Sequence, residues 1–250
     1  DGGRPVRMLG VTWDVTDRKR LEEALRQSER LAAVGQMITG LSHESRNALQ
    51  RNRACIEMLT RRLKNNPEVL PLLEEAARAQ ADLQRVHDEV RDYSRPITLE
   101  LAPQLMPEIW NEAWNHLEPL RHGKEAVLIE HAKPAETLCI ADRFRMRQVF
   151  RNLLENSLAA CGESVEIHIA CANAELNGRP AKRIAVRDNG PGLNAEQAER
   201  IFEPFYTTKT KGTGLGMAIV KRIVESHGGR IEIDPGLGRG LEVILFLPSI

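Results

Sequence analysis

Apolar residues in the first part of the chain recur at intervals of three and four, the spacing of one face of an α-helix. The first run predicts a helix that begins at Thr16 or Asp17 and ends before the turn signal Asn65-Asn66-Pro67. A second run predicts a helix over residues 67–93, which Pro96 ends. Since a single hairpin cannot bury both apolar stripes, we predict that two antiparallel hairpins form a four-helix bundle in a homodimer. The stripe residues are Leu21, Leu25, Leu31, Val34, Ile38, Leu41, Leu49, Ile56, Leu59 and Leu63, then Leu70, Leu73, Ala76, Ala79, Leu83, Val86 and Val90.

The pattern differs on either side of this helical region. Residues 4–13 alternate loosely between apolar and polar side chains, which predicts a terminal strand. Beyond Pro96, short strands and helices interleave without regular βαβ repeats, and this order predicts an α+β sandwich. We expect strands at 98–102, 126–131, 163–170, 181–187, 230–234 and 241–247, helices at 105–120, 142–160 and 214–227, and a loop at 189–213.

Composition removes several classes of function. Lys plus Arg equals Asp plus Glu at 35 each, so no net field favours nucleic acid or an anionic membrane surface. No window approaches about 18 consecutive apolar residues, and the four cysteines are scattered, which suits a reducing cytoplasm. We therefore expect a cytoplasmic protein without nucleic-acid or direct membrane contact. Because residue 1 falls inside a predicted strand, we also expect a longer parent protein, whose anchoring stays open.

Two asparagines on the predicted helix at 142–160 are the first candidates for chemistry. Asn152 and Asn156 are four residues apart and therefore share one helix face. An amide oxygen is a hard ligand that suits Mg²⁺ beside a triphosphate without adding charge. Solvated asparagine pairs are common on helices, so this pair alone is a weak signal.

Three further segments follow in the same domain. Asp188 ends an apolar strand and can accept a hydrogen bond from an exocyclic amine, and Gly190 and Gly192 allow close backbone approach. Three of the chain's aromatic residues then fall within residues 201–209, in a polar stretch that suits a lid. Finally, Gly212-Thr-Gly-Leu-Gly216 opens a helix, whose N-terminus can bind an anion. A Rossmann fold does not fit, because too little chain follows.

In their order and spacing these segments resemble the N, G1, F and G2 boxes of the ATP-binding domain shared by histidine kinases, DNA gyrase, Hsp90 and MutL, over residues 99–250. The resemblance implies a Bergerat-type α+β fold that binds ATP and Mg²⁺. It implies that Asn156 holds the metal, Asn152 lies beside the phosphates, Asp188 reads adenine, and 190–213 form the lid. Further expected nucleotide contacts are Gly190, Gly192, Phe205, Thr208, Lys209, Lys211, Gly212, Thr213, Gly214, Leu215 and Gly216.

The chain departs from that family's pattern in two places. Ala159 stands where many members carry a basic residue, so the γ-phosphate charge must be met elsewhere, by Lys209 or Lys211. Asn-Ser-Leu-Ala-Ala at this point resembles the nitrogen-regulatory branch of sensors. Leu241-Glu242 stands where a small hydroxyl residue is usual, which removes an expected secondary contact to adenine.

His43 is the candidate phosphoacceptor. It lies two residues past Leu41, which turns it about 200° away from the apolar stripe. An imidazole is a competent nucleophile when a neighbour such as Glu44 takes its other proton. An exposed His-Glu pair on a helix is usually only solvated. However, the segment resembles the H box of histidine kinases at His43, Glu44, Arg46, Asn47 and Leu49, with Ala48 in place of proline.

The H-box resemblance implies that Glu44 activates His43 and that Asn47 supports dephosphorylation of a partner. Residues 1–16 resemble the end of a PAS sensor domain, and 17–30 a signalling helix. We therefore expect a dimerisation and phosphotransfer domain at 31–98 and a catalytic domain at 99–250. The expected activity is autophosphorylation of His43, then transfer to an aspartate of a response regulator receiver domain.

Two other functions fit parts of this pattern. An ATPase-driven clamp of the gyrase or Hsp90 type is disfavoured, because those hydrolases carry glutamate at the position of Asn152. A non-catalytic dimeric scaffold, under the control of an upstream sensor, is disfavoured by the intact boxes. Failure to bind ATP would point to the scaffold.

Overall fold

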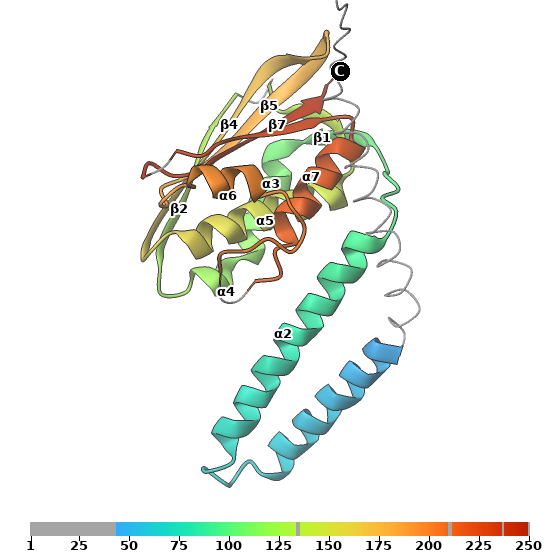
Figure 1. Ribbon diagram of the computed structural model, residues 1–250, viewed down its shortest axis with the longest axis vertical. Coiled ribbons are helices and arrows are strands. Elements are labelled where there is room, and N and C mark those ends of the chain that lie inside the picture. Colours follow the sequence, from blue (N-terminus) through green and yellow to red (C-terminus); the bar gives the residue numbers. More distant parts are fainter. Residues whose placement is uncertain (1–43, 134–135, 210–211, 237, 250) are drawn as a thin grey trace, which may run out of the picture. The chain divides into compact units, whose positions relative to one another are not determined.

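A computed structural model describes residues 44–133, 136–209, 212–236 and 238–249 (Figure 1). The chain divides into two compact units, one ending at Arg95 and the other beginning at Pro96. The predicted terminal strand, sensor end (1–16) and signalling helix (17–30) lie outside the described residues, as do His43 and Lys211. Among the described helices, none combines the length and apolar character that a bilayer crossing requires.

The first unit is a helical hairpin, as predicted. A helix over residues 44–62 is followed by a turn and by α2 (Leu70–Ser94). In the turn, the Asn66 side chain accepts a hydrogen bond from the Glu68 amide at 3.2 Å. Gln80 is buried on α2, donates to the Leu49 carbonyl at 3.0 Å and accepts from the Asn52 amide at 2.6 Å. These two bonds fix how the helices align along their length.

The second unit contains a five-stranded sheet in the order β2-β4-β5-β7-β6 and a small sheet that pairs β1 with β3. The β2–β4 pair is parallel and the other pairs are antiparallel. The strands are β1 (Ala102–Leu105), β2 (Glu125–Ala132), β3 (Leu138–Ala141), β4 (Ser164–Leu176), β5 (Arg179–Asp188), β6 (Arg230–Asp234) and β7 (Glu242–Pro248).

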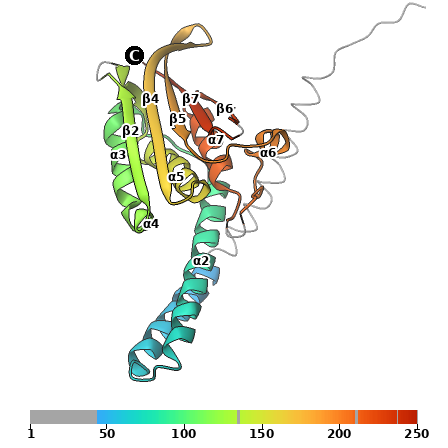
Figure 2. The same cartoon turned by 90° about the vertical axis from the view of Figure 1, so that its left-hand side faces the viewer.

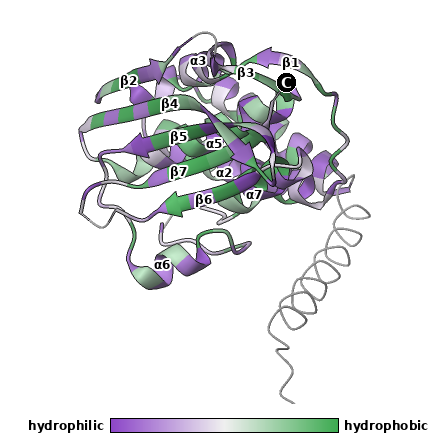
Figure 3. Ribbon diagram, turned by 90° about the horizontal axis from the view of Figure 1, so that it is seen from above, coloured by the Kyte–Doolittle hydropathy of each residue, from purple (hydrophilic) through white to green (hydrophobic). Residues whose placement is uncertain are grey.

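Helices cover one face of the larger sheet, which gives the two-layer sandwich that the sequence predicted (Figures 1 and 2). They are α3 (Met106–His116), α4 (Glu118–Arg121), α5 (Arg143–Ala160) and α7 (Gly216–Ser226), whereas α6 (Ala195–Arg200) belongs to the connection from β5 to α7. Within the helical layer, the Trp110 ring of α3 and the Phe150 ring of α5 meet edge to face at 5.8 Å. Apolar and polar residues interleave along the strands (Figure 3), so only one face of the sheet contributes to the core.

Helix α5 is held at its N-terminus by two side chains. Asp142 caps the helix by accepting from the Arg145 amide at 2.9 Å, and its other carboxylate oxygen accepts from the Glu100 amide. His227, buried at the end of α7, accepts from the Asp142 amide at 3.0 Å through Nε2. Its Nδ1 lies 2.8 Å from the Ile223 carbonyl. His227 is therefore a structural residue that joins α5 to α7.

Several predicted elements were wrong in their limits. The strand expected at 98–102 is β1, whose extent follows its pairing with β3, an element that the sequence did not predict. The helix expected at 105–120 ends at His116, and α4 begins anew at Glu118, because Pro119 has no amide hydrogen to continue the ladder. The loop expected at 189–213 contains α6, which begins with an Asn194–Gln197 capping box.

Candidate nucleotide-binding site

Helix α5 brings the predicted asparagines to the glycine-rich start of α7. Asn152 is buried and its side-chain amide donates to the Gly216 carbonyl at 3.3 Å. A Cβ atom on Gly216 would lie 3.9 Å from the Asn156 Nδ2 atom and 4.0 Å from the Asn152 Cγ atom. The two asparagines and the first turn of α7 therefore face one another. A helix N-terminus beside neutral amides is suited to an anionic group.

Lys209 adds a positive charge at this place. Its ammonium donates to the Asn156 Oδ1 atom at 2.9 Å. Although Lys209 is exposed as a residue, burial of its ammonium lowers the pKa of Lys209, and the negative charge of Glu155 opposes this effect. The predicted metal ligand and a predicted phosphate contact thus already touch each other.

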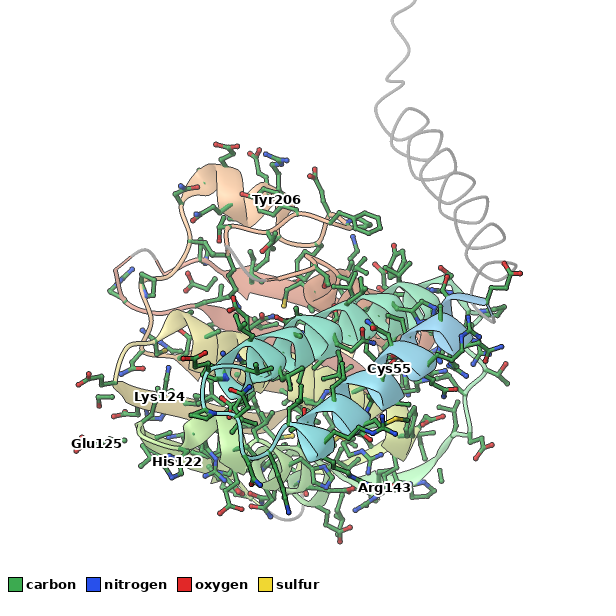
Figure 4. All side chains as sticks on the ribbon, turned by 90° about the horizontal axis from the view of Figure 1, so that it is seen from below. Cys55, His122, Lys124, Glu125, Arg143 and Tyr206 are labelled. Carbon is green, nitrogen blue, oxygen red and sulfur yellow. The ribbon has the colours of Figure 1, made fainter. Side chains whose placement is uncertain are left out.

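The base of the predicted lid is closed by backbone contacts. The Phe205 amide donates to the Gly214 carbonyl at 3.1 Å. Gly214 has φ +70°, and a Cβ there would lie 2.5 Å from the Phe205 carbonyl carbon. Phe205 itself has φ +66° and a side chain that is 53% exposed. Between these ends the loop carries Thr208, Lys209 and Gly212, all exposed. The ring centre of Tyr206, which is labelled in Figure 4, lies 4.3 Å from the guanidinium carbon of Arg200.

The other end of the site is built around Asp188, the last residue of β5. Its Oδ1 atom accepts hydrogen bonds from the Gly190 amide at 2.9 Å and the Leu241 amide at 3.1 Å. Its Oδ2 atom accepts from the Ser157 hydroxyl at 3.0 Å. Asp188 is 7% exposed. Leu241, predicted only as a departure from the family pattern, thus contributes through its backbone.

Two glycines allow the chain to close around Asp188. Gly192 has φ +71°, and a Cβ there would lie 2.5 Å from the Pro235 carbonyl oxygen. Gly240 has φ +87°, and a Cβ there would lie 1.7 Å from the Asp188 carbonyl oxygen. Both positions therefore require glycine for conformation and for space. Gly192 was a candidate from the sequence, but Gly240 was not.

Sequence reasoning also missed Ser157 and Lys124. Ser157 follows Asn156 on α5 and bonds Asp188, so adjacent residues of one helix reach opposite ends of the site. Lys124 lies with His122 and Glu125 at one edge of the unit (Figure 4). It donates to the Leu158 and Cys161 carbonyls at 2.6 and 3.2 Å, which caps the end of α5. Ser157 could have been predicted from the sequence, because its hydroxyl directly follows the candidate Asn156. The Lys124 contacts could not, because they depend on the fold.

Several of the predicted residues therefore lie close together in the second unit. Asn152, Asn156, Lys209 and Gly216 lie together, and Asp188 with Gly190 forms the second end, joined to the first through α5. Glu44 and Asn47 lie in the first unit, exposed on the helix over residues 44–62.

Comparison with known proteins gives the same two parts. Residues 33–98 match the His Kinase A (phospho-acceptor) domain, and residues 141–250 match the histidine kinase-, DNA gyrase B- and HSP90-like ATPase. The sensor histidine kinase ZraS of Klebsiella oxytoca is 32% identical over 231 residues, which cover 92% of this chain and 49% of ZraS. The chain thus spans about half the length of the curated relatives it matches.

Solved structures agree in fold. Full-length ShkA in complex with AMPPNP has a TM-score of 0.71 and 26% identity over 85% of this chain and 45% of ShkA. The histidine kinase ThkA in complex with the response regulator TrrA has a TM-score of 0.62 and 27% identity, covering 95% of this chain and 68% of that one. The site and fold define an ATP-binding domain that follows a phosphoacceptor hairpin. The chain belongs to the sensor histidine kinases of two-component systems.

Proposed function

We propose that this chain binds Mg-ATP, phosphorylates its own His43 and passes the phosphoryl group to an aspartate of a response regulator. The observation that carries the proposal is the grouping of Asn152, Asn156 and Lys209 at the start of α7, with Asp188 reached by the next residue of α5. A candidate anion-binding end and a candidate amine-reading end reached from one helix support the proposal. The match to a phosphoacceptor domain over residues 33–98 supports His43 as the acceptor.

Different residues of the chain bind the adenine and the phosphates of the nucleotide. Asp188 accepts a hydrogen bond from the exocyclic amine of adenine, because carboxylate oxygens act as hydrogen-bond acceptors. The backbone of the α7 N-terminus and the Lys209 ammonium meet the phosphate charge. In this assignment Lys209 takes the role of the basic residue that many family members carry at the position of Ala159. Thr208 and Phe205 belong to the lid that covers the phosphates.

The donor set fits Mg²⁺. The Asn156 amide oxygen is a hard, neutral ligand, and Mg²⁺ ordinarily completes its octahedron with water and phosphate oxygens. When bound, the ion offsets phosphate charge as the phosphoryl group leaves. Since Lys209 shares the Asn156 oxygen, its ammonium must release that atom or share it with the ion.

In the transfer step, a ring nitrogen of His43 attacks the γ-phosphorus, the bond to the bridging oxygen breaks, and ADP leaves. Glu44 takes the hydrogen bond from the other ring nitrogen, which favours the charge that develops on the ring. The receiver aspartate then accepts the phosphoryl group from the histidine. ThkA in complex with TrrA supports a receiver partner, and Asn47 is proposed to support removal of phosphate from that partner.

A homodimer is proposed for the hairpin. Among its described residues only Leu49 and Gln80 are buried. Leu59 and Leu83, both on the predicted apolar stripes, are 46% and 54% exposed. Apolar side chains spaced along two helices are normally covered in a four-helix bundle. A second copy supplies that cover.

The test is incubation with γ-labelled ATP and Mg²⁺, comparing wild type with His43→Gln and with the control His116→Gln. We expect acid-labile, alkali-stable label on wild type and on the control, and none on His43→Gln. Chelation of Mg²⁺ should remove the label from wild type and from the control. Label that persists on His43→Gln would move the acceptor elsewhere, and ATP binding without any label would favour the scaffold.

A further inference from the structure

The carboxylate of Asp188 already accepts three hydrogen bonds from other residues of the chain. A carboxylate offers about four lone-pair positions in its plane. The Gly190 and Leu241 amides use both positions on Oδ1, and the Ser157 hydroxyl uses one on Oδ2. Within the described part of the chain, these three are the hydrogen bonds that the Asp188 carboxylate accepts. One acceptor position is left, and it lies on Oδ2.

We propose that Ser157 is a positioning residue for nucleotide specificity: it orients Asp188 so that its single remaining lone pair meets the exocyclic amine of adenine. Ser157 touches no nucleotide in this role and acts through Asp188. The inference rests on the proposed function, because it refines how that same site selects its base. No resemblance in the sequence assigned a role to this hydroxyl.

Ser157 is itself held in place, so its hydroxyl can fix the orientation of the Asp188 carboxylate. Ser157 is 5% exposed and stands on α5 one residue after Asn156. The following turn is held by Lys124, which donates to the Leu158 and Cys161 carbonyls. The backbone amides fix one edge of the carboxylate, and Ser157 fixes the other. Rotation of the Asp188 side chain would therefore break at least one bond to a charged group.

This geometry distinguishes amines from carbonyls at position 6 of the purine ring. The 6-amino group of ATP donates into the remaining lone pair of Oδ2. The 6-oxo group of ITP is a hydrogen-bond acceptor and would face Oδ2, which is also an acceptor. The orientation of the carboxylate therefore adds nothing to the affinity for ITP. Removal of the Ser157 hydroxyl should thus weaken the binding of ATP more than the binding of ITP.

The experiment measures dissociation constants of ATP and ITP by calorimetry for wild type, Ser157→Ala and Ser226→Ala. Ser226 is the matched control, since its hydroxyl donates to the Arg222 carbonyl at 2.7 Å at the far end of α7. We expect the ITP-to-ATP ratio of constants to fall about tenfold in Ser157→Ala, the size of one hydrogen bond to a charged group. The ratio should be unchanged in Ser226→Ala.

The ratio separates positioning from loss of fold. A partly unfolded variant has fewer binding sites, but its ratio of constants for the two nucleotides is preserved. A ratio in Ser157→Ala equal to that of wild type would overturn the proposal while leaving Asp188 as the reader of adenine. Wild type that binds neither nucleotide would instead contradict the proposed function itself.

Discussion

The two ends of the nucleotide site are built by different means. At the adenine end, Asp188 is buried and held by two backbone amides and one hydroxyl. At the phosphate end, the contact between Lys209 and Asn156 is exposed and joins two side chains from distant parts of the chain. The first arrangement is fixed before a ligand arrives. The second can exchange its partners.

This difference suits what each end must recognise. A base is selected by the direction of a few hydrogen bonds, and orientation is preserved best by buried, fully bonded groups. A triphosphate with its metal is selected mainly by charge, which acts over longer distances and tolerates rearrangement. Variants at the adenine end should therefore have larger effects than variants at the phosphate end.

The largest effect is expected for Asp188→Asn. The asparagine oxygen can still accept from the Gly190 and Leu241 amides, and the Ser157 hydroxyl can turn to accept from the new NH₂ group. That NH₂ group then faces the amine of adenine, donor against donor. We expect the ATP dissociation constant to rise about a hundredfold, equivalent to about 2.7 kcal/mol, as measured by calorimetry.

Asp234→Asn is the matched control for that variant. Asp234 also accepts from the amide two residues later, that of Gly236 at 3.1 Å, but it is exposed. Its ATP affinity and melting temperature should remain close to those of wild type. Equal weakening by both variants would show that the Asp-x-Gly turns matter for stability alone.

The second effect concerns the fold around Asp188. Gly240→Ala places a Cβ against the Asp188 carbonyl oxygen, whereas Gly238, with φ +75°, has no atom within 4 Å of its Cβ position. Both changes strain the backbone at positive φ, and only the first adds overlap. We expect Gly240→Ala to lose about 2 kcal/mol more unfolding free energy than Gly238→Ala, measured by urea denaturation. Similar losses would mean that strain alone sets the requirement.

More of the residues that build the phosphate end than of those that support Asp188 could be chosen from the sequence. Asn152, Asn156, Lys209 and Gly216 could be chosen because their residue types and spacing carry the chemistry. The support of Asp188 could not, because Leu241 contributes only a backbone amide, and any residue but proline supplies one. Gly240 likewise needs the β5–β7 pairing to reveal its close approach to Asp188.

The same limit applies to the fold. Predictions for the longer periodic segments agree with α2, α5 and α7 to within a few residues, because amphipathic spacing extends over their whole length. Strand β4 is longer than the predicted 163–170 because the β4–β5 hairpin extends to Asn177-Gly178, where both residues have positive φ. That Asn-Gly pair is a hairpin signal that the sequence does contain. By contrast, β3 has four residues whose pairing with β1 is visible only in the structure.

The smallest effect is expected at the phosphate end, for Lys209→Met. The variant keeps most of the apolar stem and removes the ammonium that contacts Asn156. We expect ATP affinity to fall about tenfold, the size of one charge-assisted hydrogen bond. ADP affinity should change less, because the lid lysine is proposed to meet the γ-phosphate. Lys133→Met is the control, since its exposed ammonium pairs only loosely with Glu136 at 4.0 Å.

The relative loss for ATP and ADP decides what Lys209 does. If Lys209→Met weakens both nucleotides equally, the lysine acts on the α- or β-phosphate or through the shape of the lid, and the γ-phosphate charge is met elsewhere. If it weakens neither, the bond to Asn156 only holds the lid against α5, and the phosphate end depends on the α7 N-terminus and the metal. A loss larger than that of Asp188→Asn would reverse the ranking of the two ends, because an exchangeable surface contact would then outweigh a buried carboxylate held by three hydrogen bonds.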